Sequence, residues 1–123
     1  MKSENIIQTK SYQFAVKTVN LCRKLMDERK EYILAKQLLR SGTSIGANIE
    51  EAIGGHSEKD FLAKLTIAYK EARESKYWLN LLRDTNYLTP DEAQDLLNDL
   101  EEILRIIGSI QKTLKSKQES RNS

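Results

Sequence analysis

The sequence predicts an all-α fold, an antiparallel up-down-up-down four-helix bundle that forms a single domain over residues 1–123. Apolar residues recur at intervals of three and four, which is the spacing of one helix face. Helix-forming residues dominate, proline occurs once, and no segment alternates apolar and polar residues as a half-buried strand does. Short turn-forming segments divide the chain into four helices.

The first two helices are expected at about residues 6–28 and 32–53. The apolar stripe of the first includes Tyr12, Ala15, Val19, Cys22 and Met26. The apolar stripe of the second includes Leu34, Leu38, Ile45, Ile49 and Ala52. Gly54 and Gly55 follow, and we expect them to end the second helix in the left-handed conformation that glycine adopts at little cost.

The third and fourth helices have clear start signals and are expected at about residues 58–84 and 90–114. Ser57 can cap the third helix, because its side chain can accept from a free amide of the first turn. Thr89 and Glu92 form a capping box for the fourth, with a proline at the first helical position, where its missing N–H costs nothing.

The segment RSGTSIGAN, residues 40–48, is unusually rich in poor helix formers. A phosphate-binding loop would need a preceding strand and a lysine after the last glycine, and both are missing. In helical register, Gly42 and Gly46 lie one turn apart. We therefore expect a seam where a neighbouring helix approaches closely, with Ser, Thr and Asn bonding across it or to their own helix carbonyls.

Composition limits the compartment and the kind of chemistry. The single cysteine, Cys22, allows no internal disulfide and fits a reducing compartment. The N-terminus has no apolar signal region, and no apolar run approaches the roughly 20 residues of a membrane span. We expect a cytoplasmic protein that does not contact a membrane. Residues 116–123 are polar and are expected to be a frayed tail.

Charge is uneven although the net charge is only +2. Residues 17–40 carry four more basic than acidic residues, residues 91–105 carry five more acidic than basic ones, and an excess of three basic residues follows Gln111. Mixed charge of this kind serves solubility in most helical proteins. The alternative is a surface that binds nucleic acid. Its candidate residues are Lys17, Arg23, Lys24, Lys36 and Arg40.

Residues 38–68 contain an arginine, then Ser-Ile-Gly-Ala-Asn-Ile-Glu-Glu-Ala, then a Ser-x-x-x-Phe helix start. This motif resembles that of the 23S rRNA intervening-sequence proteins, also called S23-type four-helix-bundle proteins. The matching positions are Arg40, Ser44, Ile45, Ala47, Asn48, Ile49, Glu51, Ala52, Ser57 and Phe61. The chain departs from the family at Gly54-Gly55-His56, where basic residues are usual. It also departs in the third helix, where it keeps only Glu74 of a Gly-Ser-x-x-Glu pattern.

The resemblance implies an antiparallel bundle that assembles into a homo-oligomeric ring, most often a pentamer. A related accessory protein of diversity-generating retroelements is a pentamer that works with a reverse transcriptase and RNA. Nucleic acid, RNA before DNA, is thus the implied partner, and a protein partner is possible. The motif residues with a structural or partner-contacting role would be Ser44, Asn48, Glu51 and Glu74.

Individual side chains have competing interpretations. Asn48 is expected to bond a polar group on the third helix, such as Glu74, and the alternative is a ligand or RNA contact. Arg40 is expected to pair either with a carboxylate of a neighbouring helix or with phosphate. Three aromatic residues of the third helix are expected at or near a subunit interface, with base stacking as the alternative. They are Tyr69, Tyr77 and Trp78.

Enzyme chemistry has little support in the sequence. Bundles that hold two metal ions use Glu-x-x-His pairs, and the only histidine here, His56, lies in a glycine turn. Cys22 lies on the apolar stripe and is expected to be a core thiol. We therefore expect no cofactor, no metal and no catalytic residue. The sequence predicts a non-enzymatic homo-oligomer that binds nucleic acid, with a protein–protein scaffold as the alternative and an enzyme third.

Overall fold

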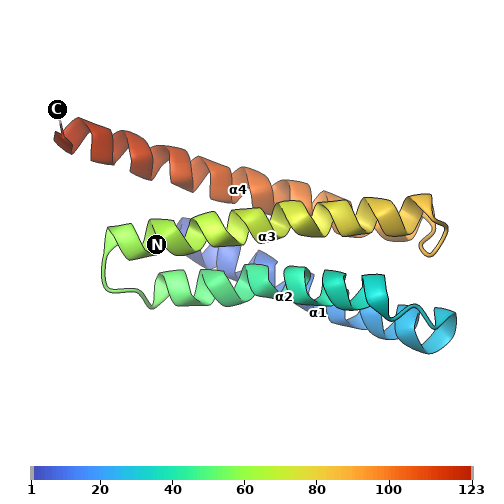
Figure 1. Ribbon diagram of the computed structural model, residues 1–123. Helices are drawn as coiled ribbons and strands as arrows, with labels where there is room; N and C mark the ends of the chain where they lie inside the picture. The colour runs from blue at the N-terminus through green and yellow to red at the C-terminus, as the bar shows by residue number, and fades with distance from the viewer. Residues whose placement is uncertain (1, 123) are drawn as a thin grey trace.

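The computed structural model describes the backbone of residues 2–122 and the side chains of residues 6–121, and it confirms the all-α four-helix bundle. The helices are α1 (Lys2–Arg29), α2 (Ile33–Ile53), α3 (Glu58–Asp84) and α4 (Pro90–Asn122). Each packs against its two neighbours, α1 against α2 and α4, and α3 against α2 and α4. The four therefore form a closed up-down-up-down arrangement (Figure 1). None of the described helices is long and apolar enough to cross a membrane.

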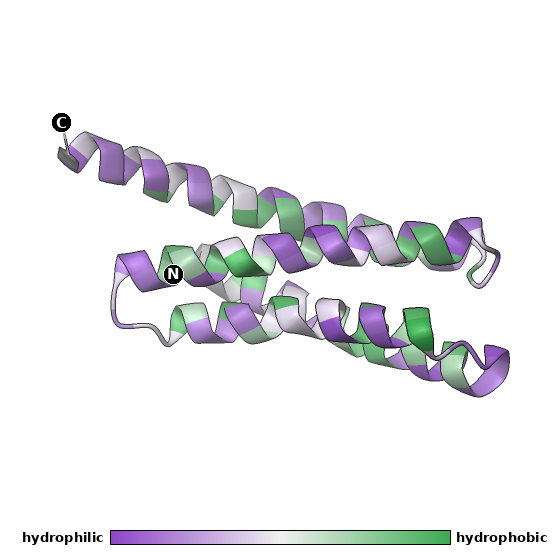
Figure 2. Ribbon diagram, viewed as in Figure 1, coloured by the Kyte–Doolittle hydropathy of each residue, from purple (hydrophilic) through white to green (hydrophobic). Residues whose placement is uncertain are grey.

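The core lies along the bundle axis and receives apolar side chains from every helix. Phe14, Leu38, Leu79 and Leu100, one from each helix, are fully buried. Burying a side chain of this size contributes about 1.5–3 kcal/mol, so these stripes account for the association of the helices. Hydrophilic and hydrophobic residues alternate along the helices, and hydrophilic ones are frequent in the C-terminal part of α4 (Figure 2).

The two predicted N-terminal caps are confirmed. The hydroxyl of Ser57 accepts a hydrogen bond from the Asp60 amide at 3.1 Å. Thr89 accepts from the Glu92 amide at 3.1 Å, while the Glu92 carboxylate accepts from the Thr89 amide at 2.9 Å. The capping box therefore satisfies two helix-end amides reciprocally and fixes where α4 begins.

The glycine seam is also confirmed, and its partner is α1. A Cβ added at Gly42 would lie 2.7 Å from Cγ2 of Thr18, and one added at Gly46 would lie 3.4 Å from the Ser11 carbonyl oxygen. Thr18 and Ser11 are both buried in α1. The absence of a side chain at Gly42 is therefore what allows α1 and α2 to approach so closely at this level.

The predicted left-handed cap at the end of α2 is wrong. Gly54 has a φ of −82°, and no described glycine has a positive φ. The Gly54 amide donates to the Glu50 carbonyl at 3.1 Å, and the Gly55 amide donates to the Ala52 carbonyl at 3.2 Å. The last turn thus tightens through a 3₁₀-type hydrogen bond between residues three apart, which satisfies a terminal carbonyl without left-handed backbone.

The C-terminal tail differs from the prediction, because α4 continues as a helix to Asn122. The residues after Leu114 are polar but include good helix formers. Ion pairs then hold this segment to α3: Glu58 is 3.7 Å from Lys117 and 3.1 Å from Arg121. Lys117 and Arg121 are four residues apart and share a helix face, so one carboxylate can bind both.

Candidate nucleic-acid interface

The predicted basic patch is mostly neutralised within the bundle. Nζ of Lys17 lies 2.8 Å from an Asp99 oxygen and 3.3 Å from an Asp95 oxygen, both on α4. The hydrogen bond to Asp99 is the main reason that the pKa of Lys17 is raised from its ordinary value. Lys24 lies 3.3 Å from Glu92, the capping-box residue. Both lysines thus bind the acidic segment of α4 and have less charge to offer an external anion.

Arg40 pairs with α3, as one of its two interpretations predicted. Its guanidinium is 3.0 Å from Glu71 and is also paired with Glu74. The Trp78 indole N–H donates to the same Glu74 oxygen at 3.0 Å. The pKa of Glu74 is lowered mainly by the Trp78 hydrogen bond and then by Arg40. This motif arginine therefore belongs to a network that joins α2 to α3.

Arg23 and Lys36 are the remaining members of the predicted patch. Both side chains are exposed. Neither forms an ion pair with a carboxylate among the residues whose side chains the structure describes. Of the five predicted cations, only these two keep a charge that no carboxylate of the described bundle balances by direct contact.

The predicted contact between Asn48 and Glu74 does not form. The Asn48 amide donates to the Ser44 carbonyl at 2.8 Å, and the Ser44 hydroxyl donates to the Arg40 carbonyl at 2.6 Å, so both bond to their own helix. Glu51 is 2.9 Å from Lys64 on α3. Among the described residues, a different pair of side chains joins the buried faces of α2 and α3, and the sequence did not predict it. The contact is a hydrogen bond of 2.9 Å between the hydroxyls of Ser41 and Ser75.

The three aromatic residues of α3 occupy different surroundings. Tyr77 is 60% exposed and meets Trp78 edge to face, with ring centroids 5.0 Å apart. Trp78 is half-buried and fixed by its bond to Glu74. Tyr69 is half-buried and packs beside α4 near Gly108. Tyr77 is therefore the one of the three with the largest exposed fraction.

Sequence reasoning missed a shallow groove of about 500 Å³ between α3 and the second half of α4. We call it the α3–α4 groove, and its lining residues are Tyr69, Gly108, Gln111, Lys112, Lys115, Ser116 and Glu119. Two contacts place the helices side by side here: Gln111 donates to the Thr66 hydroxyl at 3.3 Å, and a Cβ at Gly108 would lie 3.8 Å from the Tyr69 ring. The spacing of Gly108, Lys112 and Lys115, which is four and three, was the available signal.

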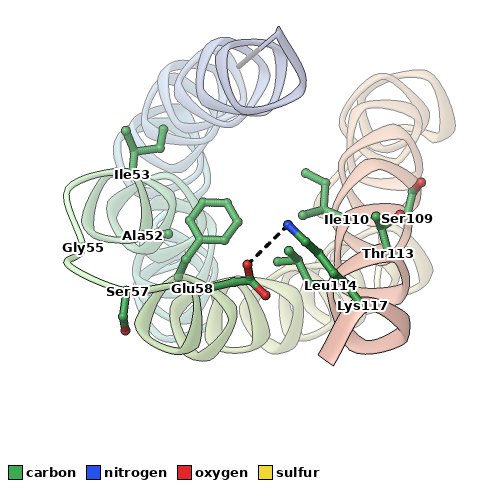
Figure 3. Close-up of a pocket in the computed structure, with 11 residues that line it drawn as sticks. Ala52, Ile53, Gly55, Ser57, Glu58, Ser109, Ile110, Thr113, Leu114 and Lys117 are labelled. Atoms are coloured by element: carbon green, nitrogen blue, oxygen red, sulfur yellow. Dashed lines mark ion pairs between the residues drawn. The ribbon is translucent and has the colours of Figure 1, made fainter. Parts of the chain in front are cut away.

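A second hollow, of about 400 Å³, lies at the end of the bundle where α2 turns into α3. Ile110 and Leu114 of α4 face Ala52 and Ile53 of α2 across it, and the Glu58–Lys117 ion pair spans its edge (Figure 3). Arg121, more than Lys117, lowers the pKa of Glu58, so this carboxyl is ionised near neutral pH. The hollow thus offers apolar contact area beside a charged pair.

Cys22 and His56 do not combine into a reactive pair. Cys22 is fully buried, and desolvation raises the pKa of its thiol to about 12, as expected for a core thiol. His56 is exposed in the turn between α2 and α3. Among the described residues, no three His, Cys, Asp or Glu side chains gather in an arrangement that could hold a metal ion.

Comparison with known proteins places these features in a family. The family model described as 23S rRNA-intervening sequence protein matches residues 3–109. A crystal structure of a protein with unknown function, from the S23 ribosomal protein family of Bacteroides thetaiotaomicron, shares 49% identity. That match covers 89% of this chain and 98% of the other, with a TM-score of 0.88. No curated protein matches at a significant level. The chain therefore belongs to the 23S rRNA-intervening sequence protein family.

Proposed function

We propose that this chain is a non-enzymatic, homo-oligomeric bundle protein of the cytoplasm that binds nucleic acid, and RNA in particular. The observation that carries the proposal is the way charge is distributed. Acidic residues of α4 are matched by basic residues within the bundle: Glu92 by Lys24, Asp95 and Asp99 by Lys17, Glu101 by Lys76, and Glu102 by Lys10. Each such pair cancels one positive and one negative charge, so the surface cations without a paired carboxylate dominate the field that a polyanion meets.

Unmatched cations remain on the surface. Arg73, Lys112 and Lys115 are exposed, as are Arg23 and Lys36. None of the five forms an ion pair with a carboxylate among the side chains that the structure describes. An oligomer would multiply such cations on one particle, and affinity for nucleic acid rises with the number of phosphates neutralised together.

The direct test is fluorescence anisotropy with labelled single-stranded RNA and with duplex DNA over a range of salt concentrations. We expect binding that weakens as salt rises, with a log–log slope of roughly −0.7 per phosphate contact for a single strand. Absence of salt-dependent binding to either probe at tens of micromolar protein would reject the function.

Assembly is a separate part of the proposal. Two apolar side chains on the outer face of α3, Ile67 and Tyr77, are 42% and 60% exposed, and such residues are commonly covered by a partner subunit. Light scattering should give a multiple of the 14.2 kDa chain mass, most simply a pentamer. A monomer at micromolar concentration would contradict this.

A protein–protein scaffold without nucleic-acid contact is the second candidate. Tyr12 on α1 is 69% exposed and Ile33 at the start of α2 is 76% exposed, so apolar surface is available away from α3. This candidate predicts a stable oligomer that gives no change in anisotropy with any nucleic-acid probe. The same titration therefore separates the two functions.

A further inference from the structure

The α3–α4 groove combines an aromatic ring with a row of cations. Tyr69 is half-buried, so its ring is held in place while part of it lines the groove. Gly108 lies opposite, and a Cβ there would still be 3.8 Å from Tyr69 Cε2. Any longer side chain at this position would extend over the edge of the ring. Glycine thus leaves an opening beside the aromatic face.

Cations lie on both sides of this opening. Lys112 and Lys115 line the groove from α4. On α3, Thr66, Tyr69, Arg73 and Lys76 are spaced three, four and three apart and so share one face. Thr66 accepts from Gln111 and Lys76 is 2.8 Å from Glu101, so this face is directed at α4 and carries Arg73 with it.

Little negative charge opposes these three cations. Glu101 forms an ion pair with Lys76. Glu71 and Glu74 form ion pairs with Arg40 on the side of α3 that faces α2. Glu119, which has its own interaction, is the acidic residue of the groove lining. The groove therefore has a net positive charge beside an accessible aromatic ring.

Part of this surface lies outside the residues that the family model matches. The family match ends at residue 109, and the Bacteroides relative covers 89% of the chain. Lys112 and Lys115 lie beyond residue 109, in the helical segment that Glu58 holds against α3 through Lys117 and Arg121. The C-terminal part of α4 therefore brings two lysines beside the aromatic ring of Tyr69, which lies within the matched residues.

We propose that the α3–α4 groove binds single-stranded nucleic acid, with one base stacked on Tyr69 and neighbouring phosphates at Arg73, Lys112 and Lys115. The inference rests on the proposed function and specifies where and how it occurs. An unpaired strand fits this chemistry because only unstacked bases expose a face to an aromatic side chain. A duplex would present its phosphates to the cations but no base to Tyr69.

The test measures binding of labelled single-stranded RNA against salt for single-charge variants. Lys112→Gln and Lys115→Gln should each make the log–log slope shallower by roughly 0.7, because each removes one phosphate contact. Lys30→Gln removes the same charge in the turn between α1 and α2, and it should leave the slope unchanged because this turn lies at the end of the bundle away from the C-terminal part of α4 (Figure 1). Equal effects of all three would show a diffuse charge effect and overturn the groove assignment.

The stacking contact is tested separately. Tyr69→Leu should weaken binding by roughly 5- to 100-fold at constant salt slope, whereas Tyr69→Phe, which keeps the ring, should bind nearly as the wild type does. Gly108→Gln leaves the charge and Tyr69 intact but fills the opening, so it should also weaken binding. It provides the test of the stacking contact if Tyr69→Leu fails to fold. Binding unaffected by either Tyr69→Leu or Gly108→Gln in folded protein would overturn the stacking contact.

Two outcomes distinguish the inference from the function on which it rests. If RNA binding is strong but responds only to Arg23→Gln/Lys36→Gln on the surface of α1 and α2, the groove is wrong and the function stands. If no nucleic acid binds the wild-type protein at low salt, both fail. Duplex DNA bound as tightly as single-stranded RNA, with no effect of Tyr69→Leu, would likewise reject the single-strand preference.

Discussion

The contact between Gly42 and Thr18 makes a sharp prediction about stability. Alanine at Gly42 would place its Cβ 2.7 Å from Cγ2 and 3.0 Å from Oγ1 of Thr18, closer than carbon atoms pack. Thr18 cannot easily rotate away, because it is fully buried and its hydroxyl donates to the Phe14 carbonyl at 2.8 Å. Overpacking of this kind costs about 1–3 kcal/mol. The better helix propensity of alanine returns about 1 kcal/mol.

Gly42→Ala should therefore lower the free energy of unfolding by up to about 2 kcal/mol. Gly46→Ala is the matched control, because its Cβ would lie 3.4 Å from the Ser11 carbonyl, at the edge of ordinary contact. That variant gains the same propensity and should be neutral or more stable by up to about 1 kcal/mol. Urea unfolding followed by circular dichroism at one protein concentration measures both.

A second mutation identifies the cause. Thr18→Ser removes the Cγ2 methyl group but keeps the hydroxyl that bonds the helix. In this background Gly42→Ala should lose most of its penalty, which gives a coupling free energy of about 0.5–3 kcal/mol in a double-mutant cycle. If Gly42→Ala is as stabilising as Gly46→Ala, or if the cycle shows no coupling, the close approach of α1 and α2 at this position is refuted.

Other contacts lead to predictions that need one variant each. Cys22 should react with a thiol reagent only as fast as the protein opens, because it is fully buried and its pKa is about 12; rapid stoichiometric labelling of native protein would disprove this. Thr89→Ala should lower the free energy of unfolding by about 1 kcal/mol, since it removes the hydroxyl that caps α4, and an unchanged urea midpoint would count against the cap. Glu74 should stabilise the fold above its ordinary pKa of 4.5, and this contribution should disappear as pH falls through the lower folded-state pKa that Trp78 and Arg40 maintain. Glu74→Gln should accordingly make stability fall less steeply below pH 4.5, whereas parallel pH curves for variant and wild type would show that the carboxylate does not matter.

Local sequence chemistry predicted the helices well where a short segment contains both partners of an interaction. The box formed by Thr89 and Glu92 is an example, since its partners are three residues apart. The seam at Gly42 was predicted because glycine inside a helix needs a packing reason, but which helix fills it could not be read from the chain. The end of α4 was placed too early, because its extension pairs with Glu58, far away in sequence.

The candidate site was predicted less well than the fold, for an electrostatic reason. From the sequence, charges can be counted only along the chain, and the excess of basic over acidic residues at positions 17–40 suggested a basic surface. The bundle brings α1 beside α4, where Lys17 and Lys24 meet acidic residues more than 60 positions away. Arg40 is likewise taken up by α3. Only three-dimensional proximity determines which cations remain unpaired.

The sequence by itself determined the fold class, the start of each capped helix, the family motif and the buried state expected of Cys22. Each of these depends on the periodicity of apolar residues or on interaction partners within one or two helical turns. Both features can be read directly from the order of residues. The tertiary structure decided that α1 fills the glycine seam, that Ser41 and not Asn48 bonds across to α3, and that Tyr69, Lys112 and Lys115 line one groove. Those outcomes depend on how helices rotate and cross, which is set by packing of the whole core at once.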